Sequence, residues 1–399
     1  MKFFNIFGLL ISISIFISCD ISENEDVDPT LSFVRIYDSE QFDQSFEPID
    51  LIQTSDGGYL ILGGFRRDDS DFLGVYLLRT DSAGNYVSDS YFPQEQVHPV
   101  GNILNMEGRY FFLSMDAIGL SVYLNEVSPD GSLIATTTLS QTYPLFVKQD
   151  GANQFILLSY NNVNKTTVLS ALNMDGSIIK EQEFGIGSGE DIEEPIIEHF
   201  TRTGKQLPFF AGRADNGQYY FNGFYNFTLS IVFTNLNSGD PDGVIQGQQD
   251  KGGISGLMNL GGSQFSLARF NFGDNYVNAN TELATTDITS SLDIEGNPMI
   301  EWENDALVGI EETQINNSEY ILYASTTKGR QIVLQIYDRG TGNFITSEYL
   351  GFSNPYRFGS MRITEDEGLV ILGQTQVAGR FPRLCLFKLG EDNLKKLVR

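Results

Sequence analysis

The sequence predicts an all-β fold, a seven-bladed β-propeller with four-stranded blades, and three observations predict it. Short apolar runs of strand character recur seven times along the 399 residues. Each run lies between two turn signals rich in Gly, Asn and Asp. Successive runs begin roughly 45 to 64 residues apart, which suits one small antiparallel unit per repeat better than the shorter repeats of a parallel β-helix.

Each repeat contains four candidate strands, as its first copy illustrates. Residues 49–54 precede the first turn, and the apolar run at 59–62 follows it. Residues 75–80 form a third strand, and 86–92 form a fourth after the turn at 81–85. Because no stretch shows sustained helical periodicity with capping residues, we expect strands throughout. The other apolar runs begin at Tyr110, Phe155, Tyr219, Phe265, Tyr320 and Leu369.

The two ends of the chain are expected to meet in the seventh blade. The last repeat supplies three clear strands, at 361–364, 369–372 and 384–387, and lacks a clear fourth. We expect residues 31–37 to pair there as the outermost strand, which closes the ring and leaves no open sheet edge. In the alternative, residues 393–398 fill this position and 31–37 lie elsewhere.

The N-terminus carries an export signal. A positively charged start is followed by an apolar run over 3–17, which is shorter than the about 20 residues of a membrane span. We expect residues 1–18 to be a signal peptide that ends just before Cys19, and an uncleaved anchor is the alternative. Residues 19–30 are acidic and poor in apolar groups, as in a flexible tether. The propeller domain then spans 31–399.

Two sets of motifs resemble those of a bacterial protein class. Phe16-Ile-Ser-Cys19 resembles a lipobox, although Phe16 stands where Leu, Val or Ile is usual, and the acidic tether is similar to the surface-export signal of Bacteroidota-type lipoproteins. Asp56-Gly-Gly-Tyr-Leu-Ile-Leu-Gly63 and Asp81-Ser-Ala-Gly-Asn85 resemble the blade repeats of propellers common among secreted and lipid-anchored Bacteroidota proteins. This resemblance implies a palmitate-type lipoprotein acylated at Cys19, held at the outer membrane and exposed at the cell surface. The fourth and fifth repeats depart most from the pattern.

The composition excludes some partners. The formal net charge is −27, which opposes binding to nucleic acid and adsorption to anionic headgroups. An acyl chain is therefore expected to hold the protein on its membrane. Besides Cys19 the chain has only Cys385, so no intramolecular disulfide is expected, and Cys385 is interpreted as a buried apolar residue of a strand.

No catalytic constellation is recognisable in the sequence. His98 and His199 are the only histidines and lack the spacing of a zinc site. Residues 185–189, Gly-Ile-Gly-Ser-Gly, lack a following helix signal and are expected to be a flexible join rather than a phosphate loop. Asp68–Asp71 and Asp240–Gly243 offer oxygen ligands, but neither follows the spacing of a complete calcium loop. We therefore predict a non-enzymatic protein without a cofactor, with calcium as an alternative.

The working face is predicted from the character of the loops. In a propeller blade, the turns joining strands one to two and three to four open on one face, and here they are short and marked by Gly. The loops between strands two and three, and those between blades, open on the opposite face and vary more, as binding loops do. Residues 270–280 are expected to form the longest and most aromatic of these loops. The candidate binding residues are Arg66, Arg67, Phe270, Phe272 and Tyr276.

Three functions from different classes are considered. The favoured one is a non-enzymatic lipoprotein scaffold that docks a protein partner in an envelope complex for assembly, uptake or secretion. The alternative is carbohydrate binding, with aromatic loop residues stacking on sugar rings. The third is a glycan hydrolase or lyase that uses carboxylates around the central channel. The lack of a catalytic motif and the variable loops favour the scaffold.

Overall fold

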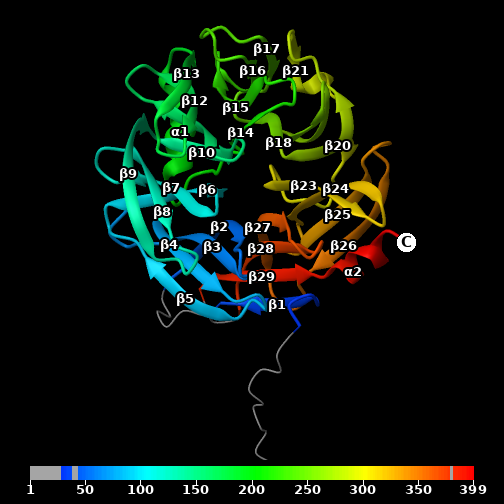
Figure 1. Ribbon diagram of the computed structural model, residues 1–399. Coiled ribbons are helices and arrows are strands. Elements are labelled where there is room, and N and C mark those ends of the chain that lie inside the picture. Colours follow the sequence, from blue (N-terminus) through cyan, green and yellow to red (C-terminus); the bar gives the residue numbers. More distant parts are fainter. Residues whose placement is uncertain (1–27, 38–43, 378–380) are drawn as a thin grey trace, which may run out of the picture.

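The computed structural model describes residues 28–37, 44–377 and 381–399 as an almost wholly β chain. Small antiparallel sheets are arranged around a common centre (Figure 1), which is the arrangement of a β-propeller. The predicted signal peptide, Cys19 and the tether up to residue 27 lie outside the described residues. The all-β class and the small four-stranded units expected from the sequence are present.

The strands of the N-terminal half pair in chain order. One set consists of β2 (Phe46–Gln53), β3 (Tyr59–Phe65), β4 (Gly74–Thr80) and β5 (Tyr86–Tyr91). The next consists of β6 (Gln96–Met106), β7 (Arg109–Asp116), β8 (Ser121–Val127) and β9 (Leu133–Thr142). A single residue pair, Gly74 with Val97, joins these two sets into one eight-stranded sheet. A separate sheet follows, with β10 (Pro144–Gln149), β11 (Gln154–Asn161), β12 (Thr166–Asn173) and β13 (Ile178–Gly185).

The C-terminal half contains four more sheets. The first has β14 (Phe210–Arg213), β15 (Tyr219–Tyr225), β16 (Thr228–Thr234), β17 (Gly243–Gln246) and, parallel to β17, β21 (Ile288–Ser290). The second has β18 (Gly252–Gly261), β19 (Gln264–Asn271), β20 (Asp274–Glu282) and β22 (Asn297–Pro298). The third has β23 (Val308–Ile315), β24 (Ser318–Thr326), β25 (Ile332–Asp338) and β26 (Phe344–Leu350). The last has β27 (Tyr356–Ile363), β28 (Leu369–Thr375), β29 (Arg383–Leu389) and β1 (Phe33–Ile36).

The hydrophobic core lies between neighbouring sheets. Every residue of β3 and β4 is buried, because these central strands are covered on both faces. Leu62 of β3 and Phe112 of β7 belong to one apolar cluster, and Leu334 of β25 and Ile371 of β28 belong to another. Burial of apolar surface at each of these interfaces is the main stabilising contribution to the chain.

The N-terminal strand pairs with the last sheet. β1 runs antiparallel to β29 as the outermost strand, with Phe33 opposite Lys388. Residues 31–37 were expected in this position. The alternative, in which residues 393–398 supply the strand, is wrong, because Glu391–Leu397 form the helix α2.

Two expectations about local structure are wrong. A helix, α1 (Glu190–Phe200), directly follows Gly185–Gly189, where a flexible join without a helix was expected. Residues 270–280 do not form a long loop, because β19 and β20 continue through them as a hairpin with a turn at Phe272 and Gly273. Both turn residues have positive φ, 49° and 94°, as a tight hairpin turn requires.

Candidate functional site

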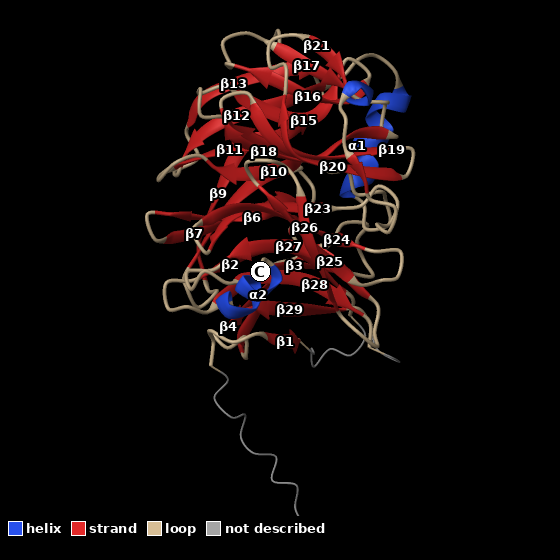
Figure 2. Ribbon diagram, turned by 90° about the vertical axis from the view of Figure 1, so that its right-hand side faces the viewer, coloured by secondary structure: helices blue, strands red, loops and turns tan. Residues whose placement is uncertain are grey.

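One flat side of the molecule, here called the loop face, carries the loops between second and third strands and the segments that join sheets. The opposite side, the turn face, carries the Gly-marked turns. α1 lies on the loop face (Figure 2). The Arg202 backbone N–H donates to the carbonyl of Asp71 at 2.7 Å, and its guanidinium donates to the carbonyl of Arg67. Because Lys205 also pairs with Asp305 at 2.9 Å, the chain after α1 contacts loops from both halves of the molecule.

A cavity of about 380 Å³ lies on the loop face between α1 and the loop that joins β3 to β4. Phe72, Tyr143 and Ile197 give it apolar walls, and Arg67 and Asp71 add charged groups. Such a combination suits an apolar group that carries a polar or charged neighbour.

The two predicted arginines have different surroundings. Arg67 lines the cavity, and its guanidinium donates two hydrogen bonds to Asp69, at 2.9 and 3.0 Å, and a third to the carbonyl of Gln94. Arg66 is half exposed and pairs with Glu47 at 3.7 Å, away from the cavity lining. The structure therefore brings Arg67, and not Arg66, to the cavity.

The three predicted aromatic residues differ in their exposure and in their contacts. Phe270 is buried, with the Lys205 ammonium 5.6 Å from its ring centroid, so it is a core residue and not an exposed contact. Tyr276 is half-buried on β20, and the Arg269 guanidinium lies 4.0 Å from its ring centroid. Phe272 is 72% exposed at the hairpin tip on the loop face, where the sequence analysis placed it.

Large apolar side chains protrude from several parts of the loop face. Ile118 and Val163, each in a loop between second and third strands, are 87% and 84% exposed. Phe272 occupies the same position in its own sheet, and Ile300 and Phe352 lie in segments that join sheets. Apart from Phe272, these residues were not predicted from the sequence, where the available signal was an apolar residue at a predicted loop tip, such as Ile118 in Asp-Ala-Ile-Gly. These side chains make the loop face a candidate interaction surface.

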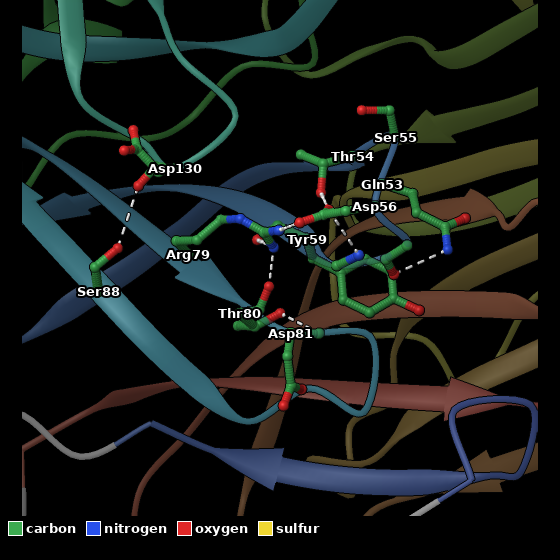
Figure 3. Close-up of polar contacts among 12 residues, drawn as sticks. Gln53, Thr54, Ser55, Asp56, Tyr59, Arg79, Thr80, Asp81, Ser88 and Asp130 are labelled. Atoms are coloured by element: carbon green, nitrogen blue, oxygen red, sulfur yellow. Dashed lines mark hydrogen bonds and ion pairs between the residues drawn. The ribbon is translucent and has the colours of Figure 1, made fainter.

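The repeated motif of the sequence is a turn-forming device. Asp56 Oδ1 accepts hydrogen bonds from the Thr54 hydroxyl at 2.6 Å and from the Gly58 N–H at 3.3 Å, and its other oxygen pairs with Arg79 (Figure 3). A side chain at Gly58 is excluded, because its Cβ would lie 2.3 Å from the backbone carbonyl oxygen of Thr80. Asp81 accepts two backbone N–H bonds within the second turn. The motif thus predicts architecture and carries no information about a ligand.

The two histidines, 101 residues apart in sequence, meet where α1 packs on the sheets, with His199 on α1 and His98 on β6. The ring centroids of His98 and His199 are 5.7 Å apart, and Phe200 packs 4.5 Å from His98. His199 Nδ1 accepts the Leu207 N–H at 2.9 Å, which places the proton of the neutral ring on Nε2. Burial lowers the pKa of His98 to about 4 and that of His199 well below its usual range. Both rings are therefore neutral at pH 7 and hold α1 on the sheets.

Acidification from pH 7.5 to 5.0 is expected to destabilise the fold by about 2 kcal/mol through His98 alone. In the unfolded chain this ring takes up a proton near its ordinary pKa of 6.5, whereas the folded protein does so only near pH 4. The contribution is complete above pH 6.5 and is lost as the pH falls toward 4. Urea unfolding at both pH values should show that His98→Gln loses about 2 kcal/mol less than wild type; equal losses would contradict this assignment.

A charged network lies where the innermost strands of several sheets meet. Arg362 of β27 contacts Asp50 of β2 at 2.7 Å, Glu311 of β23 at 3.3 Å and the amide oxygen of Asn102 on β6. Asp50 also accepts the Ser360 hydroxyl at 2.6 Å and a backbone N–H at 2.8 Å. Burial raises the pKa of Glu311, and the charge of Arg362 opposes this rise. Because both carboxylates are engaged with Arg362, the network joins sheets and leaves no free acid–base pair.

Each of the two loops considered for calcium has one carboxylate engaged by other side chains of the protein. Asp69 pairs with Arg67, and Asp242 accepts from the side chains of Asn235 and Gln218. Within residues 28–37, 44–377 and 381–399, no group of three or more His, Cys, Asp or Glu side chains is placed to hold a metal ion. Over the same ranges, no helix has both the length and the apolar character needed to cross a membrane.

Comparisons with known proteins concern the fold. No family model and no curated protein matches the chain. Among solved structures it is similar to the β-propeller domain of the Trilobed protease from Pyrococcus furiosus, with 8% identity, a TM-score of 0.46 and coverage of 87% of this chain and 95% of that one. It is also similar to the Dos1 propeller, with 10% identity, a TM-score of 0.46 and coverage of 90% of this chain and 95% of that one. A mutant of AofleA from Arthrobotrys oligospora has 9% identity, a TM-score of 0.42 and coverage of 90% of this chain and 88% of that one. At such identities these likenesses do not bear on activity.

Proposed function

We propose that this chain is a lipid-anchored, non-enzymatic scaffold whose seven-bladed propeller, closed by β1, binds a protein partner of the outer membrane through the loop face. Seven blades are proposed because β2–β5 and β6–β9, which form one of the six sheets, are joined by only one residue pair and are treated as two blades. The observation that carries the proposal is the exposure of Ile118, Val163 and Phe272 on the same face as an apolar-walled cavity. Apolar anchors and pockets of this kind form the centres of protein interfaces.

The position of residues 28–32 supports a partner site on the loop face. Ser32 accepts the Gly390 N–H at 3.0 Å, just past the end of β29 on the turn face. The chain that precedes Asp28 therefore joins the domain from this side. With acylation at Cys19, the segment 19–28 spans at most about 30 Å. The turn face then lies toward the bilayer, and the loop face points away from it, where a partner can reach it.

The proposal predicts that photo-crosslinks will form from the loop face. A photoreactive amino acid at position 118 or 272, introduced in the native cells, is expected to give one discrete crosslinked protein. The same amino acid at position 134, in place of the exposed Ile134 on the outer strand β9, should give none. Ile118→Asp should abolish the crosslink from position 272, because it places a charge in the proposed interface. Ile134→Asp should leave that crosslink unchanged. Both side chains are exposed, so neither substitution should unfold the protein.

Three outcomes would contradict the proposal. Equal crosslinking from positions 118 and 134 would mean that the loop face has no special role. Crosslinks only to glycan would favour the carbohydrate-binding alternative. In the same cells, labelled palmitate should enter the wild-type protein and not Cys19→Ala; equal labelling of both would contradict the anchor.

A further inference from the structure

A second cavity, of about 550 Å³, is built by the insertion that breaks the repeat in the fifth unit. After β20 the chain leaves its own sheet, adds β21 beside β17 of the neighbouring sheet (Figure 1), and returns as β22 to pair with β20. Residues 292–297 of this insertion line the cavity, and Arg269 and Asn278 lie on its other wall. Among the described residues, the other repeats have no equivalent of this insertion, so the cavity is a feature of the fifth unit and not of the four-stranded repeat.

Arg269 is the wall residue that most clearly lacks a partner. It is half-buried in a chain with 52 acidic residues, yet its side chain makes no hydrogen bond or ion pair with any described residue, and its Nε is fully buried. Its guanidinium stacks on Tyr276, which lies directly opposite on β20. Burial lowers the pKa of Arg269, so the protein leaves part of the desolvation cost of this charge uncompensated. A stacked guanidinium still presents its edge to an acceptor, and carboxylates suit that edge.

The rest of the lining narrows the class of ligand. Asp293 and Glu295 are exposed acidic residues on the insertion, and Asn278 and Asn297 add amides. The Asn278 amide donates to the Glu295 carbonyl at 3.3 Å, which keeps this wall close to the insertion. Carboxylates and amides bind hydroxyl groups, and the carboxylates repel a dianion such as phosphate more strongly than a monoanion. A ligand with one carboxylate and several hydroxyls satisfies both walls.

We propose that this cavity binds an acidic sugar unit, a polyhydroxylated monocarboxylate of the uronic acid type. Arg269 holds the carboxylate through its outer nitrogens, and the acidic and amide groups of the insertion accept and donate hydrogen bonds to the hydroxyls. The site is lined by β19, β20 and the insertion, and it shares no residue with the lining of the loop-face cavity. Ligand binding at this site can therefore be measured on the purified protein without the proposed protein partner.

Saturation-transfer NMR and titration calorimetry of the purified full chain with D-glucuronate, D-glucose and acetate test the site. Glucuronate is expected to bind, and glucose and acetate should each bind at least about tenfold more weakly, because each satisfies only part of the lining. Arg269→Gln should weaken glucuronate binding by about 10- to 100-fold. Thermal unfolding should be nearly unchanged in this variant, because the side chain has no polar partner in the protein.

Arg213→Gln is the matched control. Arg213 also stacks on a tyrosine, Tyr219, at 5.1 Å, but it pairs with Asp150 and lies outside the cavity. This variant should bind glucuronate with wild-type affinity. The proposal is overturned if glucuronate does not bind, if Arg269→Gln binds it as tightly as wild type, or if glucose or acetate binds equally well.

Discussion

Arg362→Met is expected to lower the free energy of unfolding by about 3–5 kcal/mol, because it leaves a buried carboxylate without its cation. Asp50 is 1% exposed and depends on the Arg362 guanidinium at 2.7 Å. Glu311 loses the same partner, and burial already raises the pKa of its carboxyl group. Since the three residues come from the innermost strands of three sheets, the loss should affect the cooperative unfolding of the whole domain. Urea unfolding at pH 7 measures it.

A second arginine on the same strand provides the control. Arg357 pairs with Glu47 but is 43% exposed, so Arg357→Met should cost less than about 1 kcal/mol. The double variant Asp50→Ala with Arg362→Met should be more stable than the sum of the two single losses predicts, because the carboxylate of Asp50 is removed together with its cation and only Glu311 is left without one. Equal losses for Arg362→Met and Arg357→Met would show that the network at the centre is solvated like a surface pair.

The strands were predictable because their signals are local. The run at 59–62 lies within β3 and 75–80 within β4, since four to six apolar residues between Gly-rich turns need no distant partner to be recognised. The position of residues 31–37 followed from counting strands, because a sheet that lacks its outermost strand leaves an open edge. Cys385, interpreted as a buried strand residue, is buried on β29.

The helix α1 was missed because its stability comes from packing. Ile192, Ile196 and Phe200 form an apolar stripe at helical spacing, but the segment is only 11 residues long, contains Pro195 and has no side-chain cap at Gly189. Isolated helices of this length are marginal, so the sheets beneath it decide its formation. The error at 270–280 has a related cause. Its Asn and Gly content suggested a loop, whereas the alternating burial along β20 depends on the neighbouring strands.

The candidate sites were harder to predict because they join residues that are far apart in sequence. Asp50 and Arg362 are separated by 312 residues, and their contact requires the first and last sheets to be adjacent. The loop-face cavity combines Arg67 with α1, a helix that was not expected. Arg66 and Arg67 were indistinguishable as a dipeptide; only the direction of each side chain separates the one that lines the cavity from the one that pairs with Glu47.

Phe33→Ala is expected to cost about 3–5 kcal/mol, as for other buried Phe→Ala changes, although β1 has only four residues. Phe33 is 7% exposed in a cluster that contains residues of both β29 and β3, and its ring packs against Gly84 in the turn after β4. The hydroxyl of Tyr37 donates to the carbonyl of the same glycine at 3.0 Å. β1 therefore links the last sheet to the first, and loss of its anchor should expose two interfaces at once.

Val34→Ala on the same strand separates this role from a general effect of substitution in β1. Val34 is 48% exposed, so its truncation should cost less than about 0.5 kcal/mol. Hydrogen exchange gives the decisive comparison: in Phe33→Ala the β29 amides that pair with β1 should exchange faster than those of β24, whereas in Val34→Ala the two strands should be protected as in wild type. Uniform loss of protection in Phe33→Ala would mean that β1 contributes to the core without acting as the closing strand. Selective loss of amide protection at β29 would support a ring that is closed by β1. In that case the pairing of β1 with β29 would open before the other sheets unfold.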